Sequence, residues 1–287
     1  MIHRLNNVRS DLLGYGSLAL LAAESEELRN SQLELSFVSV SWFDANMSAA
    51  LAAVLARILD RYNTLSIVDL SEAQRSILER NGFMSNFGYA APSTWGSTIV
   101  PHRRFERSQA TEFYEYLEEY LPGKGLPEMT NDFSLRFQQS LGEIFINAQI
   151  HSQSELGVFV CGQFFPTKQR LDITIADAGV GIPRKVSERF NRNVPAVAAL
   201  RWALVEGNTT KQGTPGGVGL KLLCQFVAQN RGKLQIASGG AFWEFGGGPE
   251  RFVSLSDPFP GTAVTLEVNT ADTNPYDSDD EDNVRKA

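Results

Sequence analysis

The sequence is poor in the residues that build disulfide scaffolds and zinc sites. Its 287 residues include only two cysteines, Cys161 and Cys224, which have no CxxC spacing, and three histidines that form no HxxH or HExxH group. A disulfide framework is therefore excluded, and a zinc site is not expected. This cysteine usage also predicts a reducing, cytoplasmic compartment.

The sequence also lacks a long apolar run. A helix needs about 20 predominantly apolar residues to span a bilayer, and the Ala/Leu-rich stretch 49–59 is interrupted by Arg57. Residues 12–23 are apolar enough for the core of a signal peptide, but Asp11 precedes them, two glycines interrupt them and no clean A-x-A site follows. We therefore expect a soluble chain that is neither secreted nor bound to a membrane.

The charge is mildly acidic and concentrated at one end of the chain. The formal net charge is −7, and residues 271–287 contribute −4 of it, with six acidic residues against Arg285 and Lys286, so that about −3 remains for the rest. An acidic chain is a poor candidate for electrostatic binding to nucleic acid or to an anionic membrane. Residues 271–287 are expected to form a disordered, solvated tail.

With 43% hydrophobic residues the chain has enough apolar side chains to form a core, and its length suggests two domains. Residues 1–87 show the alternation of strands and helices that is typical of a small α/β domain. We predict strands at 33–40 and 66–70, a helix that begins at Asp44 as its N-cap and runs to Tyr62, and a helix over 71–80 that ends at Asn81-Gly82.

The rest of the chain predicts a connector and a second α/β domain. Residues 88–107 are rich in Gly, Pro, Ser and Thr without periodicity, and a charged helix follows at 108–121, so 88–130 is assigned to a connector with a linking helix. The second domain, 131–270, is expected to contain helices at 131–152, 194–206 and 220–230, and strands at 158–164, 171–176, 234–237 and 263–268, with two glycine-rich turns.

The first helix of this second domain carries a polar stripe. At 100° per residue, Glu143, Asn147 and His151 fall within about 80° of one another, opposite an apolar face. Ile146 and Ile150 flank the stripe, so it is not a plain solvent face, and half-buried polar side chains need partners. An ordinary amphipathic helix is the alternative.

A carboxylate, Asp177, directly follows the predicted strand at 171–176. The alternation in Leu171-Asp-Ile-Thr-Ile-Ala places Asp177 at the end of a half-buried strand, and Gly179 and Gly181 then allow backbone to approach a ligand closely. Such a carboxylate can accept a hydrogen bond from an exocyclic amine such as that of adenine. A plain turn after a strand is the alternative.

A second glycine cluster precedes the helix at 220–230. Gly217-Val-Gly219-Leu220 leads directly into this helix, whose N-terminal N–H groups suit a phosphate. The chain contains no GxxxxGK[ST] loop, and neither glycine cluster matches GxGxxG between a strand and a helix, which excludes P-loop and dinucleotide-fold interpretations. A flexible loop without a ligand is the alternative here.

In this order and at these separations, the three segments closely resemble the N, G1 and G2 boxes of the GHKL, or Bergerat-fold, ATP-binding superfamily. Two later segments, Ile236-Ala-Ser238-Gly and Phe259-Pro-Gly261-Thr262, resemble its closing strands. The resemblance covers about residues 131–269. It implies an α+β sandwich with helices on one face of a mixed sheet, and ATP and Mg²⁺ as cofactors.

The resemblance also implies roles by position. Asn147 would ligate Mg²⁺, Asp177 would recognise adenine with help from Thr262, and Glu143 would be the general base that activates water. The backbone that lines the nucleotide would include Gly179, Gly181, Gly217, Gly219 and Leu220. His151 is interpreted as structural or close to phosphate rather than as a phosphoacceptor.

Residues 182–215 correspond to the ATP lid of the family, in which Lys211 either reaches phosphate or is a solvated lysine. Lys221 stands where histidine kinases often have another glycine. In the N-terminal domain, Phe37 to Leu51 resembles a diverged STAS domain, but Asp44-Ala-Asn46-Met47 lacks the acceptor serine of that family and Ser48 is an imperfect substitute. A generic small α/β domain is the alternative.

Three functions remain open at this point. The first is a Mg-ATP hydrolase that uses turnover as a conformational switch. The second is a serine/threonine kinase of the anti-sigma-factor type that acts on a separate STAS-like partner. The third is a regulatory module that binds ATP without hydrolysing it and exposes a surface for a protein partner. A histidine kinase is disfavoured because no helical pair with a phosphoacceptor histidine precedes the ATP domain, and a homodimer is left open.

Overall fold

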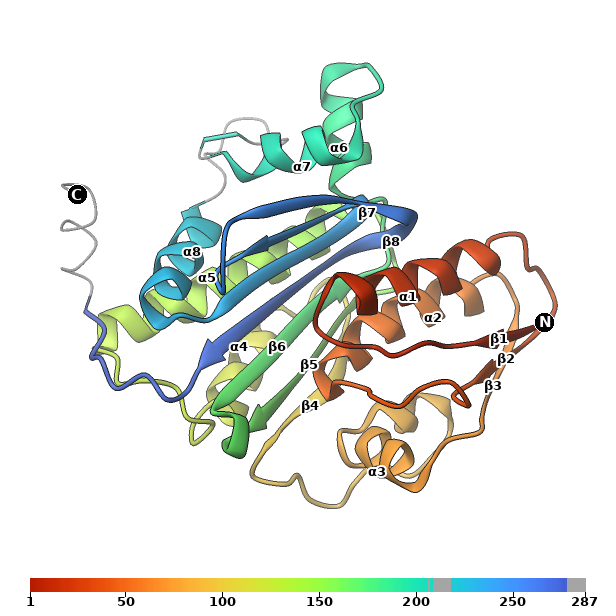
Figure 1. The fold of residues 1–287 in the computed structure, drawn as a ribbon, viewed down its shortest axis with the longest axis horizontal. Coiled ribbons are helices and arrows are strands. Elements are labelled where there is room, and N and C mark those ends of the chain that lie inside the picture. Colours follow the sequence, from red (N-terminus) through yellow and green to blue (C-terminus); the bar gives the residue numbers. More distant parts are fainter. Residues whose placement is uncertain (206, 209–217, 278–287) are drawn as a thin grey trace.

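The computed structural model describes residues 1–205, 207–208 and 218–277 of the chain. Within them, helices pack around two β-sheets, one with three parallel strands and one with five antiparallel strands (Figure 1). The expected mixture of a small α/β unit with an α+β sandwich is confirmed. The acidic end of the chain, from residue 278, lies outside the described residues.

The three-stranded sheet is parallel because a helix connects each of its strands to the next. The strand order is β1-β2-β3, and the bounds are β1 Ile2–Arg4, β2 Gln32–Ser36 and β3 Thr64–Val68. The crossover helices are α1, Leu12–Glu24, and α2, Ser48–Leu59. This part of the chain therefore forms two consecutive strand-helix-strand units.

The helix α3, Glu72–Arg80, begins and ends where local signals predict. Ser71 accepts a hydrogen bond from the backbone of Gln74 and the Gln74 side chain bonds back to Ser71, which makes a capping box. Gly82, with φ of +84°, follows the helix in the left-handed conformation that stops it.

The helix α1 was not predicted, because its sequence has no polar stripe. Its buried residues, which include Tyr15, Leu18 and Leu21, lie on several sides of the helix. One side belongs to the core of the three-stranded sheet, and α1 also packs against β8 of the larger sheet. A helix covered on opposite sides lacks the amphipathic period by which a helix is recognised in sequence.

Asp44 does not cap a long helix as predicted. A 3₁₀ turn, η1 at Ala45–Met47, separates it from α2, and its side chain makes no cap hydrogen bond. Its carboxylate oxygens instead accept hydrogen bonds from the backbone N–H of Ser10 and from Nε1 of Trp42, both at 2.9 Å. Asp44 therefore ties the segment before α1 to the segment before α2.

The larger sheet has the strand order β4-β5-β6-β8-β7, and every pairing in it is antiparallel, where a mixed sheet was expected. Its bounds are β4 Ile99–Phe105, β5 Val158–Phe165, β6 Arg170–Asp177, β7 Lys233–Phe245 and β8 Arg251–Asn269. In the central pair, Asp177 at the end of β6 lies opposite Thr262 of β8. The register thus brings together two predicted site residues that are far apart in sequence.

The segment 88–130 is more than the connector that was expected, because it supplies the edge strand β4. Pro101 interrupts the sequence pattern of this strand, and the pairing with β5 shifts register between Val100 and Arg103. An edge strand tolerates a proline at such an irregularity, since the missing N–H is not needed there. The Pro101 carbonyl accepts a hydrogen bond from Tyr116 Oη at 2.6 Å, which ties β4 to α4, Ala110–Tyr120.

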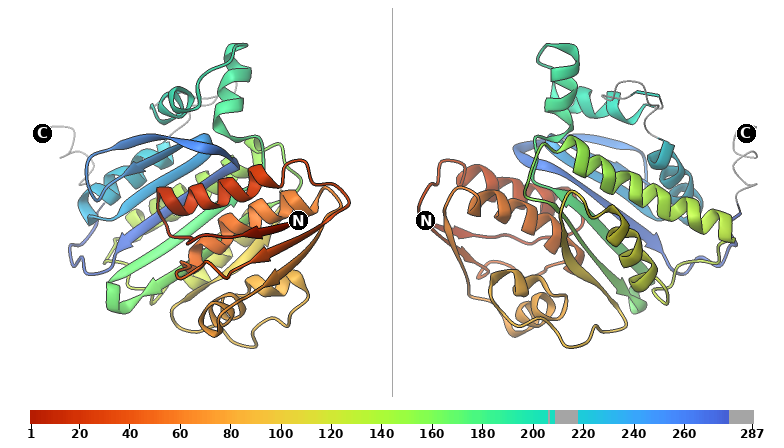
Figure 2. Two further views of the ribbon diagram at one scale, coloured as in Figure 1. Left: turned by 45° about the vertical axis from the view of Figure 1, so that its right-hand side comes forward. Right: turned by 180° about the vertical axis from the view of Figure 1, so that it is seen from behind.

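Helices cover both faces of the larger sheet (Figure 2). On one face lie α4, α5 at Asn131–His151 and α8 at Val218–Asn230. On the other face lie α1 and α2, so that one hydrophobic core joins residues of the N-terminal part, such as Leu18 and Leu51, to Phe159 and Phe242 of the larger sheet. Among the described residues, no helix combines the length and the apolar character needed to cross a bilayer.

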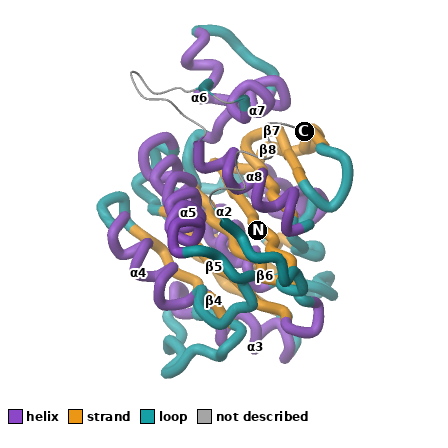
Figure 3. The backbone as a smooth tube through the Cα atoms, turned by 90° about the vertical axis from the view of Figure 1, so that its left-hand side faces the viewer, coloured by secondary structure: helices purple, strands orange, loops and turns teal. Residues whose placement is uncertain are grey.

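Two short helices stand at one end of the larger sheet (Figure 3). The helix α6, Gly181–Phe190, occupies a segment that was expected to be a turn, and α7, Ala196–Leu204, matches the predicted helical stretch. Pro183 lies in the first turn of α6, where its missing N–H costs no intrahelical hydrogen bond. Two further 3₁₀ turns are η2, Phe83–Phe87, and η3, Pro166–Lys168.

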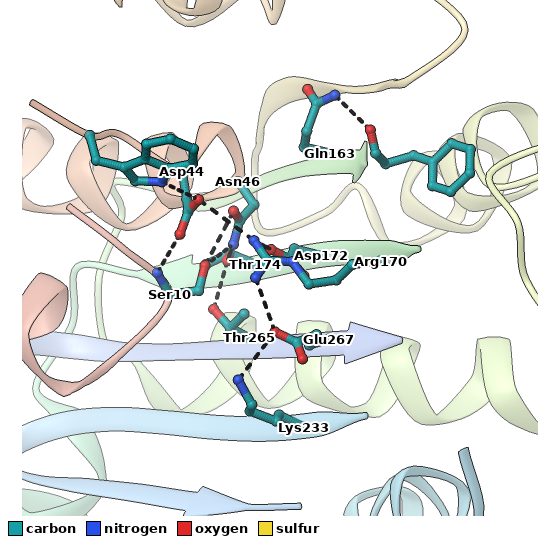
Figure 4. Close-up of polar contacts among 12 residues, drawn as sticks. Ser10, Asp44, Asn46, Gln163, Arg170, Asp172, Thr174, Lys233, Thr265 and Glu267 are labelled. Atoms are coloured by element: carbon teal, nitrogen blue, oxygen red, sulfur yellow. Dashed lines mark hydrogen bonds and ion pairs between the residues drawn. The ribbon is translucent and has the colours of Figure 1, made fainter. Parts of the chain in front are cut away.

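The face of the larger sheet that α1 and α2 cover contains a buried polar cluster (Figure 4). Arg170 Nη2 lies 2.9 Å from Asp172 Oδ2, and the same guanidinium lies 3.6 Å from Asp44 Oδ1 and 3.4 Å from Glu267 Oε2. Burial raises the pKa of Asp172 well above its usual range, and the neighbouring Arg170 opposes this shift. The cluster links the N-terminal part to β6 and β8 through charge as well as packing.

A hydrogen-bonded chain of side chains runs through the same interface. Tyr15 Oη lies 2.6 Å from Thr265 Oγ1, which lies 2.7 Å from Thr174 Oγ1. Asn46 Nδ2 donates to Thr174 Oγ1 at 2.9 Å. Buried polar groups need such partners, so this chain specifies how α1 and η1 dock on the sheet.

Candidate functional site

A cavity of about 190 Å³ opens between α5, the end of β6, the neighbouring residues Ile236 of β7 and Thr262 and Val264 of β8, and the helices α6 to α8. Six of the residues predicted as a site from sequence line it: Glu143, Asn147, Asp177, Gly181, Leu220 and Thr262. They come from five separate elements and span about 120 positions of the chain. The fold therefore gathers the polar stripe, the strand-end carboxylate and the start of α8 around one space.

The remaining predicted residues have different outcomes. Gly179 and Gly219 each donate a backbone hydrogen bond to a carboxylate that lines the cavity. His151 is the last residue of α5. Lys211 and Gly217 lie outside the described residues.

Asp177 is a buried carboxyl group at the end of β6. Its exposed fraction is 3%, and its Oδ1 accepts a hydrogen bond from the N–H of Gly179 at 2.8 Å. Burial raises the pKa of Asp177 to about 7, although backbone hydrogen bonds from Gly179 and Thr262 act in the opposite direction. A buried carboxyl group with a pKa this far from its usual value, in the wall of a cavity, is typical of a functional site.

Ser238 holds the turn around Asp177 and was not predicted as a site residue. Its Oγ lies 2.9 Å from Thr262 Oγ1, donates to the carbonyl of Gly261 at 3.0 Å and accepts from the N–H of Ile182 at 2.8 Å. One buried hydroxyl thus connects β7, β8 and the start of α6. A small polar residue inside an apolar strand is the signal that sequence reasoning could have used.

Two glycines at this turn permit contacts that no side chain would allow. A Cβ at Gly179 would lie 2.1 Å from the carbonyl oxygen of Ser152. A Cβ at Gly261, where φ is +86°, would lie 2.2 Å from the carbonyl oxygen of Asp177. The close packing of backbone on backbone therefore fixes the position of the Asp177 carboxyl.

Glu143 contacts the N-terminus of α8. Its Oε2 accepts a hydrogen bond of 2.6 Å from the N–H of Gly219, in the first turn of that helix. The first N–H groups of a helix have no partner within the helix and carry the positive end of its dipole, so they favour an anion. Asn147 lies one turn further along α5 and lines the same cavity.

The rest of the cavity wall is largely apolar. Its larger apolar side chains come from seven elements and are Ile144, Ile175, Ile182, Val186, Trp202, Leu204, Leu220, Ile236 and Val264. Lys185 and Asn208 add polar groups that sequence reasoning missed. Such a wall suits a flat apolar ring, and the few polar groups would set its orientation.

No cluster of three or more metal-binding His, Cys, Asp or Glu side chains occurs in the described part of the chain. The cavity wall near α8 offers the Glu143 carboxylate, which contacts the N–H of Gly219, and the Asn147 amide lines the same cavity. One or two protein oxygens are enough for Mg²⁺, which usually keeps water and phosphate ligands. The donor set therefore fits Mg²⁺ held together with a phosphate and does not fit zinc.

No model of a known protein family matches this chain. No curated protein sequence matches it either. The assignment of the site therefore depends on its residues and their geometry.

Proposed function

We propose that residues 131–270 form a Mg-ATP-binding unit of the GHKL type within a regulatory protein, and that this unit hydrolyses ATP as a conformational switch. The observation that carries the proposal is the convergence of Glu143, Asn147 and Asp177 on one cavity. These residues belong to two motifs that are separate in sequence, and the two motifs would have no reason to share a cavity if one were only a helix face and the other only a turn.

The end of the cavity near Asp177 supports recognition of adenine. The Asp177 carboxylate can accept a hydrogen bond from the exocyclic amine, and the nearby Thr262 hydroxyl can donate one to a ring nitrogen. The apolar side chains around it would pack on the faces of the ring. Specificity for adenine then comes from a buried acceptor, which would be left unpaired by a base that presents a carbonyl group there.

The end of the cavity near α8 supports binding of phosphate. The N–H of Gly219 already binds a carboxylate oxygen, so this helix terminus is oriented toward an anion. Asn147 would hold Mg²⁺ through its side-chain oxygen, and the ion would neutralise charge on the phosphates. In the hydrolytic role, the Glu143 carboxylate orients a water molecule and takes its proton.

The STAS-like element of the N-terminal part does not present a serine at its acceptor position. Ser48, the hydroxyl nearest to the acceptor position of a STAS domain, is fully buried at the start of α2 and accepts a hydrogen bond from Asn81 Nδ2 at 3.1 Å. If the unit were a protein kinase, its substrate would therefore be a separate partner. The kinase and the non-hydrolysing module remain the alternatives that the experiment must separate.

The test is phosphate release by the purified full chain with Mg-ATP, together with direct measurement of nucleotide binding. Glu143→Gln should lower the rate by about 100-fold or more while ATP still binds. Asp177→Asn should weaken binding about tenfold or more, because the exocyclic amine loses a charged acceptor. Glu118→Gln, on the exposed side of α4, is the matched control and should match the wild type.

The possible results separate the three functions. Free phosphate that depends on Glu143 supports the hydrolase. ATP binding without turnover selects the non-hydrolysing module, and labelled phosphate on an added STAS-like protein selects the kinase. Absence of ATP binding, or turnover that Glu143→Gln leaves unchanged, would refute the proposed function.

A further inference from the structure

A second cavity, of about 170 Å³, lies on the other side of the turn that follows Asp177. Its walls come from the end of α1, from α2, from the start of α6 and from residues 258–261 of β8. It therefore lies between the N-terminal part and the turn at the proposed adenine site. Gly179, Val180 and Gly261 belong to its wall, whereas Asp177, Gly181 and Thr262 line the first cavity.

The second cavity is cationic in a chain whose net charge is negative. Arg57, Arg61 and Arg184 line it against a single acid, Glu26, which gives the lining residues a formal charge of +2. Arg184 also lies 3.3 Å from the exposed Glu188. Burial lowers the pKa of Arg61, and the nearby cations Arg29 and Arg57 lower it further, as expected where like charges gather.

Backbone groups hold two of these guanidinium groups in place. Arg61 donates from Nη2 to the carbonyl of Ser25 at 2.8 Å, and from Nε to the carbonyl of Leu28 at 3.3 Å. Arg57 donates from Nη1 to the carbonyl of Gly179 at 3.1 Å. Each guanidinium has five N–H donors, so both retain donors for a further acceptor.

Apolar side chains form the rest of the wall. Ala22, Val54, Ile58 and Phe259 come from α1, α2 and β8. A cavity with guanidinium groups and an apolar wall suits an anion that carries an apolar group. Arginine binds the oxygens of phosphate with paired hydrogen bonds, which favours a phosphate ester over a monovalent anion.

We propose that this cavity binds a phosphate-bearing small molecule and that its occupation changes the affinity of the adenine site. The connection is short, because Gly179 accepts a hydrogen bond from Arg57 and donates one to Asp177 Oδ1. A ligand that draws the Arg57 guanidinium toward itself acts directly on the turn that positions the Asp177 carboxyl. The effect on affinity rests on the proposed function, whereas binding of the anion does not.

The binding test uses the full chain, with phenyl phosphate and inorganic phosphate as probes in calorimetry. Phenyl phosphate should bind saturably and more tightly than inorganic phosphate, because its ring packs on the apolar wall. Arg184→Gln should weaken its binding about tenfold, the loss expected for a charge-assisted hydrogen bond. Arg192→Gln, which removes an exposed cation outside both cavities, should bind as the wild type does.

The same measurement in saturating Mg-ATP locates the site. Phenyl phosphate that still binds occupies the second cavity, and phenyl phosphate that ATP displaces occupies the first cavity, which would overturn the proposal. Failure to bind saturably, or equal binding by Arg184→Gln and wild type, would also overturn it. Equal affinity for the two probes would refute the role of the apolar wall.

The coupling test measures the affinity for adenosine with and without saturating phenyl phosphate. A change of about fivefold or more is expected in the wild type, and Arg57→Gln should abolish the change. Unchanged adenosine affinity would refute the coupling. If adenosine and ATP do not bind at all, the proposed function fails, while the binding of phenyl phosphate is still decided by the arginine variants.

Discussion

The ionisation of Asp177 should make adenosine binding depend on pH. Burial raises the pKa of this carboxyl group to about 7, so its proton is lost within the neutral range. An exocyclic amine donates a hydrogen bond, and the ionised carboxylate accepts it best. Adenosine should therefore bind the ionised form and release a proton from Asp177 as it binds.

The size of the effect follows from the pKa. With a pKa of about 7, roughly a tenth of the carboxyl groups are ionised at pH 6 and roughly nine tenths at pH 8, so affinity should rise about tenfold between them. The pH dependence of folding stability has the opposite sign to that of adenosine affinity. A raised pKa means that the protonated carboxyl stabilises the nucleotide-free fold below about pH 4, and that this contribution is lost as the pH rises through about 7.

The assay is calorimetry of adenosine binding at pH 6, 7 and 8 in two buffers that differ in ionisation enthalpy, which counts the protons released. Adenosine is the right probe because it has no phosphate group that titrates. Thr262→Val is the matched control, since it should lower affinity at every pH while the tenfold rise remains. A wild-type affinity that is flat with pH, or a rise that persists in Asp177→Asn, would refute the reasoning.

Three further predictions concern stability, measured by urea unfolding. Tyr15→Phe should lower the free energy of unfolding by about 1 kcal/mol, because the buried hydrogen bond between α1 and Thr265 of the larger sheet is lost. An unchanged unfolding midpoint would show that this hydrogen bond contributes nothing to stability. Arg170→Met should lower the free energy of unfolding by about 3–5 kcal/mol, because the buried Asp172 loses its cation. Adding Asp172→Asn should recover part of this loss. Strictly additive losses in the double variant would contradict the pairing. Gly261→Ala should cost about 1–3 kcal/mol, since its φ of +86° disfavours a side chain and its Cβ would meet backbone; wild-type stability in this variant would contradict that close contact.

Much of the candidate site was accessible from sequence because its parts are locally encoded. The spacing of Glu143 and Asn147 puts them on one face of a helix whatever surrounds it, and strand alternation delivers Asp177 to a strand end. The capping box at Ser71 and the glycine at residue 82 likewise set the ends of α3. Periodicity and caps act over a few residues, so they can be read without knowing the fold.

Other features were missed because they exist only through distant partners. The helix α1 has no amphipathic period because two sheets cover it, and Tyr15 on this helix finds its hydrogen-bond partner Thr265 at a separation of 250 residues. The strand β4 contains a proline that only an irregular edge pairing accommodates. Ser238 became a site residue only when β7, β8 and the start of α6 met around its hydroxyl.

The sequence by itself determined the types of groups at the site, their spacing along each element and the α/β class. Only the tertiary structure decided that Glu143 contacts the start of α8, that Thr262 lies opposite Asp177, and that α1 and α2 cover the second face of the larger sheet. It also created the cationic cavity beside Gly179, from Arg57 and Arg61 in and just after α2 and from Arg184 in α6, more than 120 residues further along the chain. The physical reason is that local periodicity sets which way side chains point along one element, whereas strand register and burial of apolar surface set which elements meet.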